Sequence, residues 1–562
     1  MKLKKVTLIV LFLTLICIGC TCKSNQHVSN VHKTDAPRII NIINFIRQTD
    51  YRVEDSDQLL FETVEEQIKL VSKYHFPATF LFQYDALINP RYQELMKNEL
   101  PSNCELGAWW EITQPHVEAA GIKWRGEHSW VSHANIAFTT GYTPREREQL
   151  VDVYMKKFKE IYSYYPKSVG SWFIDSHTLA YMYEKYGIVA SSNCKDQIGT
   201  DGYTLWGGYW NQAYYPSRFN AYMPAQTEEA QIPVPIFRML GSDPIYQYDT
   251  GLGRRRQDVI SLEPVYKESG MNKEWVEYFL ESIVDQPCLL FNYAQAGQEN
   301  SFTWKAMQKG LEMQFPLLDS LRIAGKIRLE TLETSGKWFK EQFKHTPPTA
   351  VTTLTDVRNE GRKSVWFNSR YYRTNLLWEG KSFRFRDIHM FDEKFKSLYY
   401  DTAGEGNQFF YYTLPVVDGF MWSTSDERAG LRIMKVDKNK IRSEILFEDP
   451  VVKEISKDIL QVICKDENEN TFNIVFYEDR FEISCELQEK GLNWTLELTT
   501  ASDVELPFLS FGTKKINASF HDFDYTITCE EGSIERGNLS DEFVFRLIPY
   551  GNRLVVDCKN TL

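Results

Sequence analysis

The sequence lacks several features that would define a protein class. After residue 19 it has no apolar run long enough to cross a bilayer, which takes about 20 residues. Apart from Cys17, Cys20 and Cys22, its cysteines show neither CxxC nor any other spacing typical of metal ligands. Basic residues are in deficit, because without the three lysines of the first 19 residues 61 basic side chains face 76 acidic ones, a net charge of −15. These absences argue against a multispan membrane protein, a cysteine-based zinc centre and a nucleic-acid partner.

The first 37 residues have the composition of an export signal and a tether. Three lysines among the first five residues precede an apolar run over 6–18, which is typical of a signal peptide. The run ends at Cys20, after a glycine, and resembles the bacterial lipobox, in which the cysteine is acylated. We therefore expect a lipoprotein signal peptide in 1–19, lipid on Cys20, a flexible tether in 20–37 and anchoring in the bacterial cell envelope. An ordinary cleavable signal is the alternative, since Cys17 stands where a lipobox usually has leucine.

Four further cysteines raise the question of disulfides. Export would permit bridges among them, and four cysteines allow three pairings. Because their spacing is not distinctive, we expect buried free thiols. They are Cys464, Cys485, Cys529 and Cys558.

Residues 38–345 alternate between strand-like and helix-like patterns. Apolar runs alternate with amphipathic stretches, and Thr143 begins a capping box with Glu146. Alternation of this kind indicates a parallel sheet, and we predict a (β/α) barrel of about seven or eight strands. The predicted strands are 39–46, 78–82, 105–110, 168–174, 188–193, 234–240 and 288–293, with helices near 60–71, 143–161, 176–186, 273–284 and 303–321.

After about residue 346 the pattern changes to a period of two. Apolar residues alternate along 472–476, 481–487 and 494–498, which is typical of antiparallel strands in a β-sandwich. We therefore predict the fold class α/β, with a barrel and a C-terminal helical segment in 38–345 and an antiparallel β-sandwich in 346–562.

Carboxylates are frequent where the predicted barrel strands end. Functional groups of α/β barrels stand at the C-terminal ends of strands. Hydrolysis of a glycosidic bond requires one carboxyl group to protonate the leaving oxygen and another to attack or to activate water. The strand ends supply Asp50, Glu111, Asp175, Asp243, Asp249, Glu263 and Glu299.

Asp175 is the preferred catalytic residue. The apolar strand before it ends in residues 172–174, Trp-Phe-Ile, a setting that can raise the pKa of a carboxyl group. The structural alternative is that Asp175 caps the following helix. Its catalytic partner is left open among Asp243, Glu111 and Glu299. These three also have structural interpretations, as a turn-forming residue for Asp243 and as solvated loop acids for the others.

Tryptophans are concentrated in the first part of the chain, since 10 of the 14 precede residue 346. The segment 195–226 is long and rich in aromatic residues beside Asn, Gln and Asp, and loops of this length are usually functional. Flat aromatic faces beside polar groups suit a sugar ring, although the same residues could form a second hydrophobic cluster over the barrel. The predicted substrate-binding residues are Asp50, Trp109, Trp110, Trp130, His133, His177, Trp206 and Trp210.

The histidines raise the possibility of a metal site. His128 and His133 could join Asp50 as zinc ligands, but their spacing of five does not place them on one helical face. Isolated histidines are more often surface or hydrogen-bonding residues. We therefore predict no metal and no other cofactor, with Asp50, His128 and His133 as the ligand set of the metal-dependent alternative.

Three segments carry a family resemblance. Residues 69–82, KLVSKYHFPATFLF, are similar to the "lkkygikATFFv" segment of polysaccharide deacetylases, and 104–107 stand in place of "hEIGnH". Residues 164–170 follow at the expected distance. On these residues the first 300 or so positions resemble the glycoside hydrolase/deacetylase barrel superfamily, which includes glycoside hydrolase families 38 and 57. The whole chain resembles a family of secreted bacterial proteins of undefined function in which such a barrel precedes a β-rich domain.

The chain departs from the deacetylase pattern at its metal ligands. Where deacetylases have "TFDD" after the first strand, this chain has Arg47-Gln48-Thr49-Asp50, and the HxxxH motif is absent. The resemblance therefore favours the family 57 pattern, in which barrel carboxylates act without a metal, and it makes Asp175 the counterpart of a strand-four catalytic acid.

These observations predict a glycoside hydrolase that acts on a polysaccharide or oligosaccharide by carboxylate acid/base chemistry without a metal. Its expected partners are a carbohydrate and the lipid anchor, and no nucleic acid. The alternatives are a metal-dependent deacetylase-like esterase or amidase, and a glycan-binding surface lipoprotein without activity.

Overall fold

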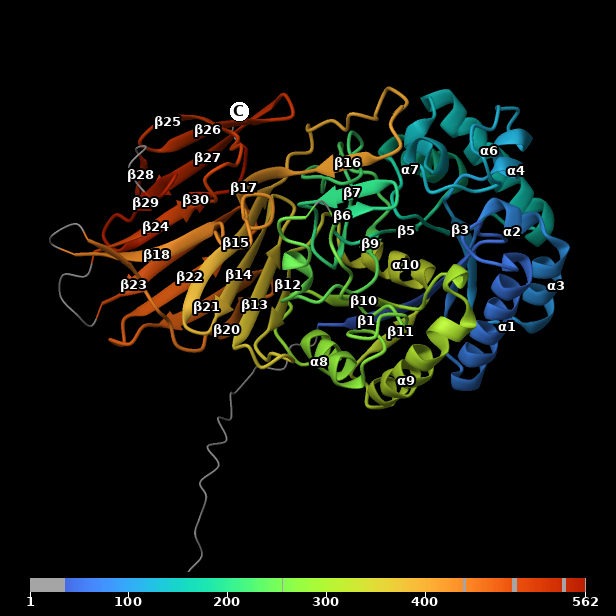
Figure 1. Ribbon diagram of the computed structural model, residues 1–562, viewed down its shortest axis with the longest axis horizontal. Coiled ribbons are helices and arrows are strands. Elements are labelled where there is room, and N and C mark those ends of the chain that lie inside the picture. The colour runs from blue at the N-terminus through green and yellow to red at the C-terminus, as the bar shows by residue number, and fades with distance from the viewer. Residues whose placement is uncertain (1–35, 255, 438–440, 488–492, 538–541, 561–562) are drawn as a thin grey trace, which may run out of the picture. The chain divides into compact units, whose positions relative to one another are not determined.

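The computed structural model describes residues 36–254, 256–437, 441–487, 493–537 and 542–560 (Figure 1). Residues 35–562 form one compact unit. The predictions for the signal peptide, for acylation of Cys20 and for all but the last two residues of the tether lie outside the described residues. Within the described ranges, no helix is long and apolar enough to cross a bilayer.

The first part of this unit is a nearly closed parallel barrel. The strands follow the order β10-β1-β2-β3-β4-β5-β9-β8, and all but β8 pair in parallel. The barrel nearly closes between β9 and β10, where the rings of Phe237 and Tyr293 lie 4.9 Å apart. The bounds are β1 (Arg38–Ile46), β2 (Thr79–Phe82), β3 (Glu105–Trp109), β4 (Ser168–Gly170), β5 (Ala190–Asn193), β8 (Ala213–Tyr214), β9 (Ile236–Arg238) and β10 (Asn292–Ala296), with β11 (Arg328–Glu330) beside β1. The predicted α/β barrel is confirmed.

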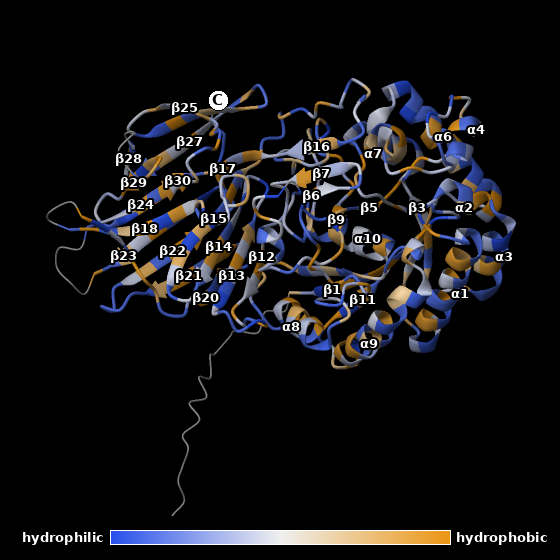
Figure 2. Ribbon diagram, viewed as in Figure 1, coloured by the Kyte–Doolittle hydropathy of each residue, from blue (hydrophilic) through white to orange (hydrophobic). Residues whose placement is uncertain are grey.

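Amphipathic helices surround the barrel strands, and Figure 2 shows apolar and polar segments alternating around their coils. The predicted capping box is present at the start of α6, where Thr143 and Glu146 bond reciprocally. Gly187 ends α7 in a left-handed conformation, as its position predicts. The bounds are α1 (Ser56–Tyr74), α2 (Tyr84–Ile88), α3 (Pro90–Glu99), α4 (Gln114–Ala119), α5 (Ala134–Ala137), α6 (Pro144–Tyr162), α7 (Ser176–Tyr186), α8 (Lys273–Val284), α9 (Trp304–Ile323) and α10 (Leu332–Gln342).

The C-terminal part consists of two large antiparallel sheets, as the period-two pattern predicts. The 10-stranded sheet contains β12 (Thr349–Thr353), β13 (Arg362–Asn368), β14 (Tyr372–Glu379), β15 (Ser382–Met390), β17 (Leu414–Asp418), β18 (Gly430–Val436), β19 (Arg442–Glu444), β24 (Asn493–Thr499), β28 (Ser533–Arg536) and β29 (Phe545–Ile548). The 8-stranded sheet contains β20 (Val451–Ser456), β21 (Ile459–Lys465), β22 (Thr471–Phe476), β23 (Arg480–Glu486), β25 (Phe508–Phe511), β26 (Lys515–Phe520), β27 (Phe523–Glu531) and β30 (Arg553–Asp557).

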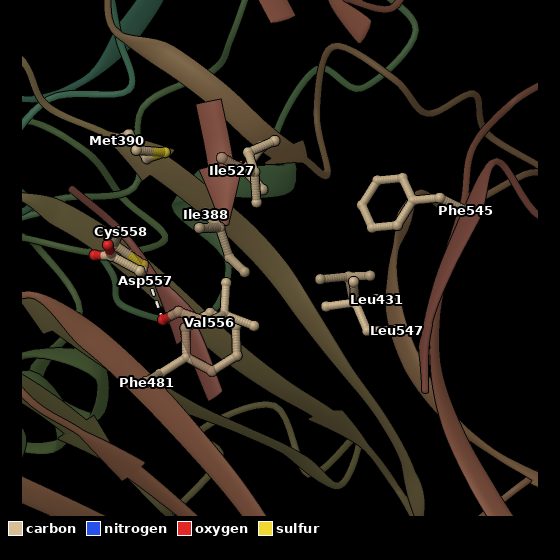
Figure 3. Close-up of a pocket in the computed structure, with 11 residues that line it drawn as sticks. Ile388, Met390, Leu431, Phe481, Ile527, Phe545, Leu547, Val556, Asp557 and Cys558 are labelled. Atoms are coloured by element: carbon tan, nitrogen blue, oxygen red, sulfur yellow. Dashed lines mark hydrogen bonds between the residues drawn. The ribbon is translucent and has the colours of Figure 1, made fainter. Parts of the chain in front are cut away.

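The two sheets enclose an apolar core. Figure 3 shows side chains of both sheets around a small cavity, among them Ile388, Leu431 and Phe545 from one sheet and Phe481 and Ile527 from the other. This lining is apolar except for Asp557 and Cys558, which is typical of a sandwich interior. The described cysteines, including the four of the C-terminal part, are free thiols, as expected.

The barrel and the β-sandwich share a small sheet and an aromatic stack. Strand β16 (Phe409–Tyr412) of the C-terminal part pairs in parallel with β7 (Tyr203–Trp206), which pairs with β6 (Gln197–Thr200). The rings of Trp210 and Trp366 stack with centroids 3.8 Å apart. Trp206 Nε1 donates to Asp418 at 2.8 Å. The long loop therefore fastens the barrel to the sandwich.

Several predicted strands have other bounds in the structure, among them 188–193 and 234–240, which are shorter there, and two differ by four residues at one end. β4 ends at Gly170 rather than at residue 174, because the Ser171 hydroxyl donates to the Trp110 carbonyl and the chain leaves the ladder there. The last barrel strand begins at Asn292 rather than at residue 288. The amides of Cys288 and Leu289 instead donate to the Glu454 carboxylate of the sandwich, at 2.8 and 2.9 Å. An apolar run indicates burial, but here its first residues contact strands of the sandwich, since the Ala350 amide of β12 also donates to the Cys288 carbonyl.

Candidate functional site

One buried arginine gathers three of the predicted strand-end carboxylates. Arg47, directly after β1, donates to both oxygens of Glu111 at 2.8 and 2.7 Å. Its Nη1 lies 3.3 Å from Asp50 Oδ2 and 3.0 Å from Glu299 Oε2. Glu111 follows β3, and Glu299 follows β10, which borders β1. The strand ends therefore bring Asp50, Glu111 and Glu299 to one internal cation.

Glu111 and Asp50 are fully engaged by donors. Besides Arg47, Glu111 accepts from Gln83 Nε2 at 2.9 Å and from Trp172 Nε1 at 2.8 Å. Asp50 accepts from the backbone and guanidinium of Arg52 at 2.7–3.0 Å. Burial alone would raise the pKa of Asp50, but the Arg52 hydrogen bonds and the Arg47 charge lower it below the usual value. Both groups are suited to holding the two arginines rather than to moving protons.

Glu299 differs from its neighbours because its side chain is poorly satisfied. Its Oε2 accepts no hydrogen bond from any described residue, although Arg47 is close. Burial raises the pKa of Glu299 to about 7, with a contribution from the Glu111 charge, while Arg47 and Ser301 oppose the rise. A carboxyl group of this kind carries a proton near neutral pH and can give it up, as general acid catalysis requires.

A second carboxyl group, Glu263, is linked to Glu299 through one residue. Gln298 Nε2 donates to Glu263 Oε1 at 2.8 Å, and the Ser261 hydroxyl donates to Oε2 at 2.7 Å. Burial raises the pKa of Glu263, and these two donors and the charge of Lys195 partly offset the rise. The half-buried Tyr266 has its pKa raised by burial and by the charges of both Glu263 and Glu299. Glu263 and Glu299 thus share Gln298 and Tyr266 as neighbours, and they are called here the carboxyl pair.

Aromatic side chains surround these groups. Trp172, which donates to Glu111, stacks on Tyr203 with centroids 6.3 Å apart. Trp130 covers the Arg47 guanidinium at 4.1 Å. Toward solvent, Tyr51 is 48 % exposed and stacks on His128 at 4.6 Å. These faces could contact the apolar side of a sugar ring.

Asp175, the residue preferred from the sequence, has a structural role here. It is the N-cap of α7, where Oδ1 accepts from the Thr178 amide at 2.9 Å and from Arg147 at 3.1 Å. Oδ2 accepts from the hydroxyls of Thr139 and Thr178 at 2.6 and 2.7 Å. Burial opposes ionisation, but Arg147 and these donors lower the pKa of Asp175 below its usual value. The expectation that its setting raises this pKa is therefore wrong, because the chain supplies a buried cation and three donors.

We expect the Asp175→Asn variant to hydrolyse a glycan substrate with nearly the wild-type kcat. Asparagine still caps the helix, but Arg147 loses its carboxylate partner, so thermal stability should fall by about 1–3 kcal/mol. Steady-state rates per folded molecule and a melting curve test this. A large loss of kcat in a variant with unchanged melting temperature would restore Asp175 as a catalytic residue.

The remaining predicted site residues lie apart from the carboxyl pair or are enclosed by packing. Asp243 accepts from the amides of Ile245 and Tyr246 and from Trp275 Nε1, and burial raises its pKa. Trp109 stacks on Phe45 in the barrel core, and Trp110 packs on His116 and Tyr154. Trp206 and Trp210 are fully buried in the contact with the β-sandwich. This agrees with the alternative that segment 195–226 forms a second hydrophobic cluster. His177 pairs with Glu148 at 3.1 Å, and His133 is exposed before α5.

The residues of the metal-dependent alternative do not fit a zinc ion. Asp50 is occupied by two arginines, and His128 is exposed and stacked on Tyr51. No group of three His, Cys, Asp or Glu side chains that could hold a metal occurs in the described part of the chain. A guanidinium, that of Arg47, stands at the centre of the strand-end carboxylates instead.

Sequence reasoning missed part of the cluster. The sequence pattern marks Arg47 only as the residue after a strand, and it marks Glu263 only as one of seven strand-end carboxylates. Lys195, Gln298 and Tyr266 were not selected at all. The signal for Arg47 was present, because an arginine that directly follows an apolar strand and precedes an aspartate is placed to pair inside a barrel.

Comparisons with known proteins bear on the fold. No family model matches the chain, and no curated protein matches it. A solved structure from Parabacteroides distasonis, described as a candidate glycoside hydrolase/deacetylase, is 15% identical with a TM-score of 0.50. The match covers 67% of this chain and 90% of that one. A 4-alpha-glucanotransferase from Thermococcus litoralis is 9% identical with a TM-score of 0.29 over 93% of this chain and 99% of that chain. The match to the Parabacteroides distasonis structure supports the fold of this chain alone, a (β/α) barrel with a β-rich remainder.

Proposed function

We propose that this protein hydrolyses glycosidic bonds of a polysaccharide or oligosaccharide with the carboxyl pair Glu263 and Glu299. The observation that carries the proposal is two buried carboxyl groups with raised pKa values, joined through Gln298 at the C-terminal end of a barrel. Two such groups are what glycosidic hydrolysis requires. The proposal retains the prediction of carboxylate chemistry in a barrel and replaces Asp175 by Glu263.

Glu299 is the general acid. Its pKa of about 7 keeps it protonated below neutral pH, and its Oε2 accepts no hydrogen bond from any described residue. As the bond between the anomeric carbon and the bridging oxygen breaks, the proton of Glu299 passes to that oxygen. Arg47 then stabilises the carboxylate that remains, since its Nη1 is 3.0 Å away.

Glu263 is the partner of the acid. Ser261 and Gln298 fix its two oxygens, and the Lys195 charge favours its ionised form. In that form it attacks the anomeric carbon or takes a proton from the attacking water, and the anomeric configuration of the product distinguishes the two routes. The proposed steps use the two carboxyl groups alone, and among the residues that the structure describes no three His, Cys, Asp or Glu side chains are grouped to hold a metal.

The expected location of the site follows from the prediction for Cys20. A lipid on this residue and a short polar tether would hold the barrel close to the cell envelope, where long glycans are encountered. The membrane partner and the surface or periplasmic location are part of the proposal.

A glycan panel tests the proposed function. The full chain is incubated with plant, host and bacterial-envelope glycans, and new reducing ends and free acetate are both measured with and without EDTA. We expect reducing ends from at least one glycan, unchanged by EDTA. Acetate without reducing ends would indicate deacetylation, and binding without either product would indicate a glycan-binding protein.

A further inference from the structure

A buried lysine beside the carboxyl pair has no hydrogen-bond partner. Lys195 follows β5 and is 1 % exposed, yet its Nζ bonds to no described residue. Burial lowers the pKa of Lys195, and the Arg238 charge lowers it further, while Cys194, Glu263 and Asp196 oppose this. An ammonium group enclosed without an acceptor is strongly destabilising, so this position calls for a ligand.

A second cation nearby is also incompletely satisfied. Arg238, at the end of β9, donates through Nη2 to Asp196 at 2.6 Å, but its Nε and Nη1 have no partner among the described residues. Asp196 is shared with Arg373 of β14, which also donates to Asp387 at 2.8 Å and to the Gly208 carbonyl at 2.7 Å. The two aspartates therefore balance the two arginines.

Lys195 is left with Glu263 as its remaining counter-charge. Glu263 already accepts hydrogen bonds from Ser261 and Gln298, and burial raises its pKa, which disfavours its charged form. Unpaired donors on two neighbouring cations thus stand beside one member of the carboxyl pair. Donors of this kind bind carboxylate, sulfate or phosphate oxygens.

We propose that Lys195, supported by Arg238, binds an anionic substituent of the substrate, a carboxylate or a sulfate ester on the sugar next to the Glu263 carboxyl group. This inference rests on the proposed function for its position relative to the cleaved bond. It adds the substrate class, a glycan rich in uronic acid or sulfated sugars. The net negative charge of the chain makes a local cationic site necessary for such a substrate.

Monosaccharide binding tests the anion site without requiring turnover. Glucuronate, glucose 6-sulfate and glucose are titrated into the full-length protein by calorimetry, with the wild type, Lys195→Met and the exposed-lysine control Lys267→Met. We expect the wild type to bind one of the charged sugars about 10- to 100-fold more tightly than glucose. The preference should vanish in Lys195→Met and persist in Lys267→Met. Which charged sugar binds identifies the carboxylate or the sulfate.

The variant should fold, because removing an unpaired buried ammonium group removes a desolvation cost. A melting curve checks this, and Lys195→Gln offers a polar replacement should methionine unfold the protein. Equal affinity for charged and neutral sugars, an unchanged preference in both folded Lys195 variants, or no binding of any of the three sugars would overturn the inference.

This outcome is separable from that of the proposed function. Hydrolysis of glycans in the panel without any preference for charged sugars would overturn the anion site and leave the hydrolase intact. Binding of glucuronate through Lys195, with no reducing ends from any glycan, would overturn the hydrolase and leave the anion site.

Discussion

The Glu299→Gln variant should lose about 1,000-fold in kcat on any glycan that the wild type hydrolyses, with little change in KM. Glutamine has the same shape but cannot donate the proton that the leaving oxygen needs. It also removes a buried carboxyl group of raised pKa, so the variant should fold at least as well as the wild type. Steady-state kinetics and a melting curve measure both effects.

The matched control is Glu268→Gln, which changes an exposed glutamate five residues after Glu263 in the same loop. It should keep wild-type kcat and KM, since a surface charge outside the cluster contributes little. Retention of more than a tenth of the wild-type kcat by Glu299→Gln would remove Glu299 as the acid.

The Arg47→Met variant should lose about 3–5 kcal/mol of stability, since it leaves several buried carboxylates without their shared cation. Arg47 contacts Glu111, Asp50 and Glu299 at 2.7–3.3 Å, and all four side chains are buried, so bulk water would replace the guanidinium poorly. Urea unfolding at pH 7 measures the loss.

Arg47→Lys separates charge from geometry. It keeps the positive charge but not the forked pair of bonds to Glu111, so its stability should lie between those of the wild type and Arg47→Met. Arg91→Met, which breaks an exposed pair with Asp57, should change stability by at most about 0.5 kcal/mol. Equal stability of Arg47→Met and Arg91→Met would contradict the central role of Arg47.

Local signals in the sequence account for much of the fold. The helix 273–284 is found at its predicted bounds. Thr143 begins α6 and Gly187 ends α7, as their residue types predict. Strands were less well delimited, because the register of a strand depends on its neighbour. The run from Cys288 is apolar, yet it bonds to Glu454, 166 residues away, and only later joins the barrel.

The site was predictable as a set of positions but not as a set of roles. Strand ends located Asp50, Glu111 and Glu299, because parallel strands deliver their ends to one face. Their pKa values depend on partners that no local pattern reveals. Asp175 accepts a hydrogen bond from Arg147 of another helix, whereas Oε2 of Glu299 accepts none from the described residues. Trp210 finds its stacking partner, Trp366, on a strand of the β-sandwich.

The pH dependence of kcat/KM for the wild-type protein, on the first glycan that it cleaves, tests the carboxyl pair most directly. Glu299 must be protonated in the free enzyme, and burial raises its pKa to about 7. The account therefore predicts that kcat/KM falls tenfold per pH unit above about pH 7, and that this limb is insensitive to EDTA. A rate that stays level or rises from pH 7 to pH 9 would contradict it.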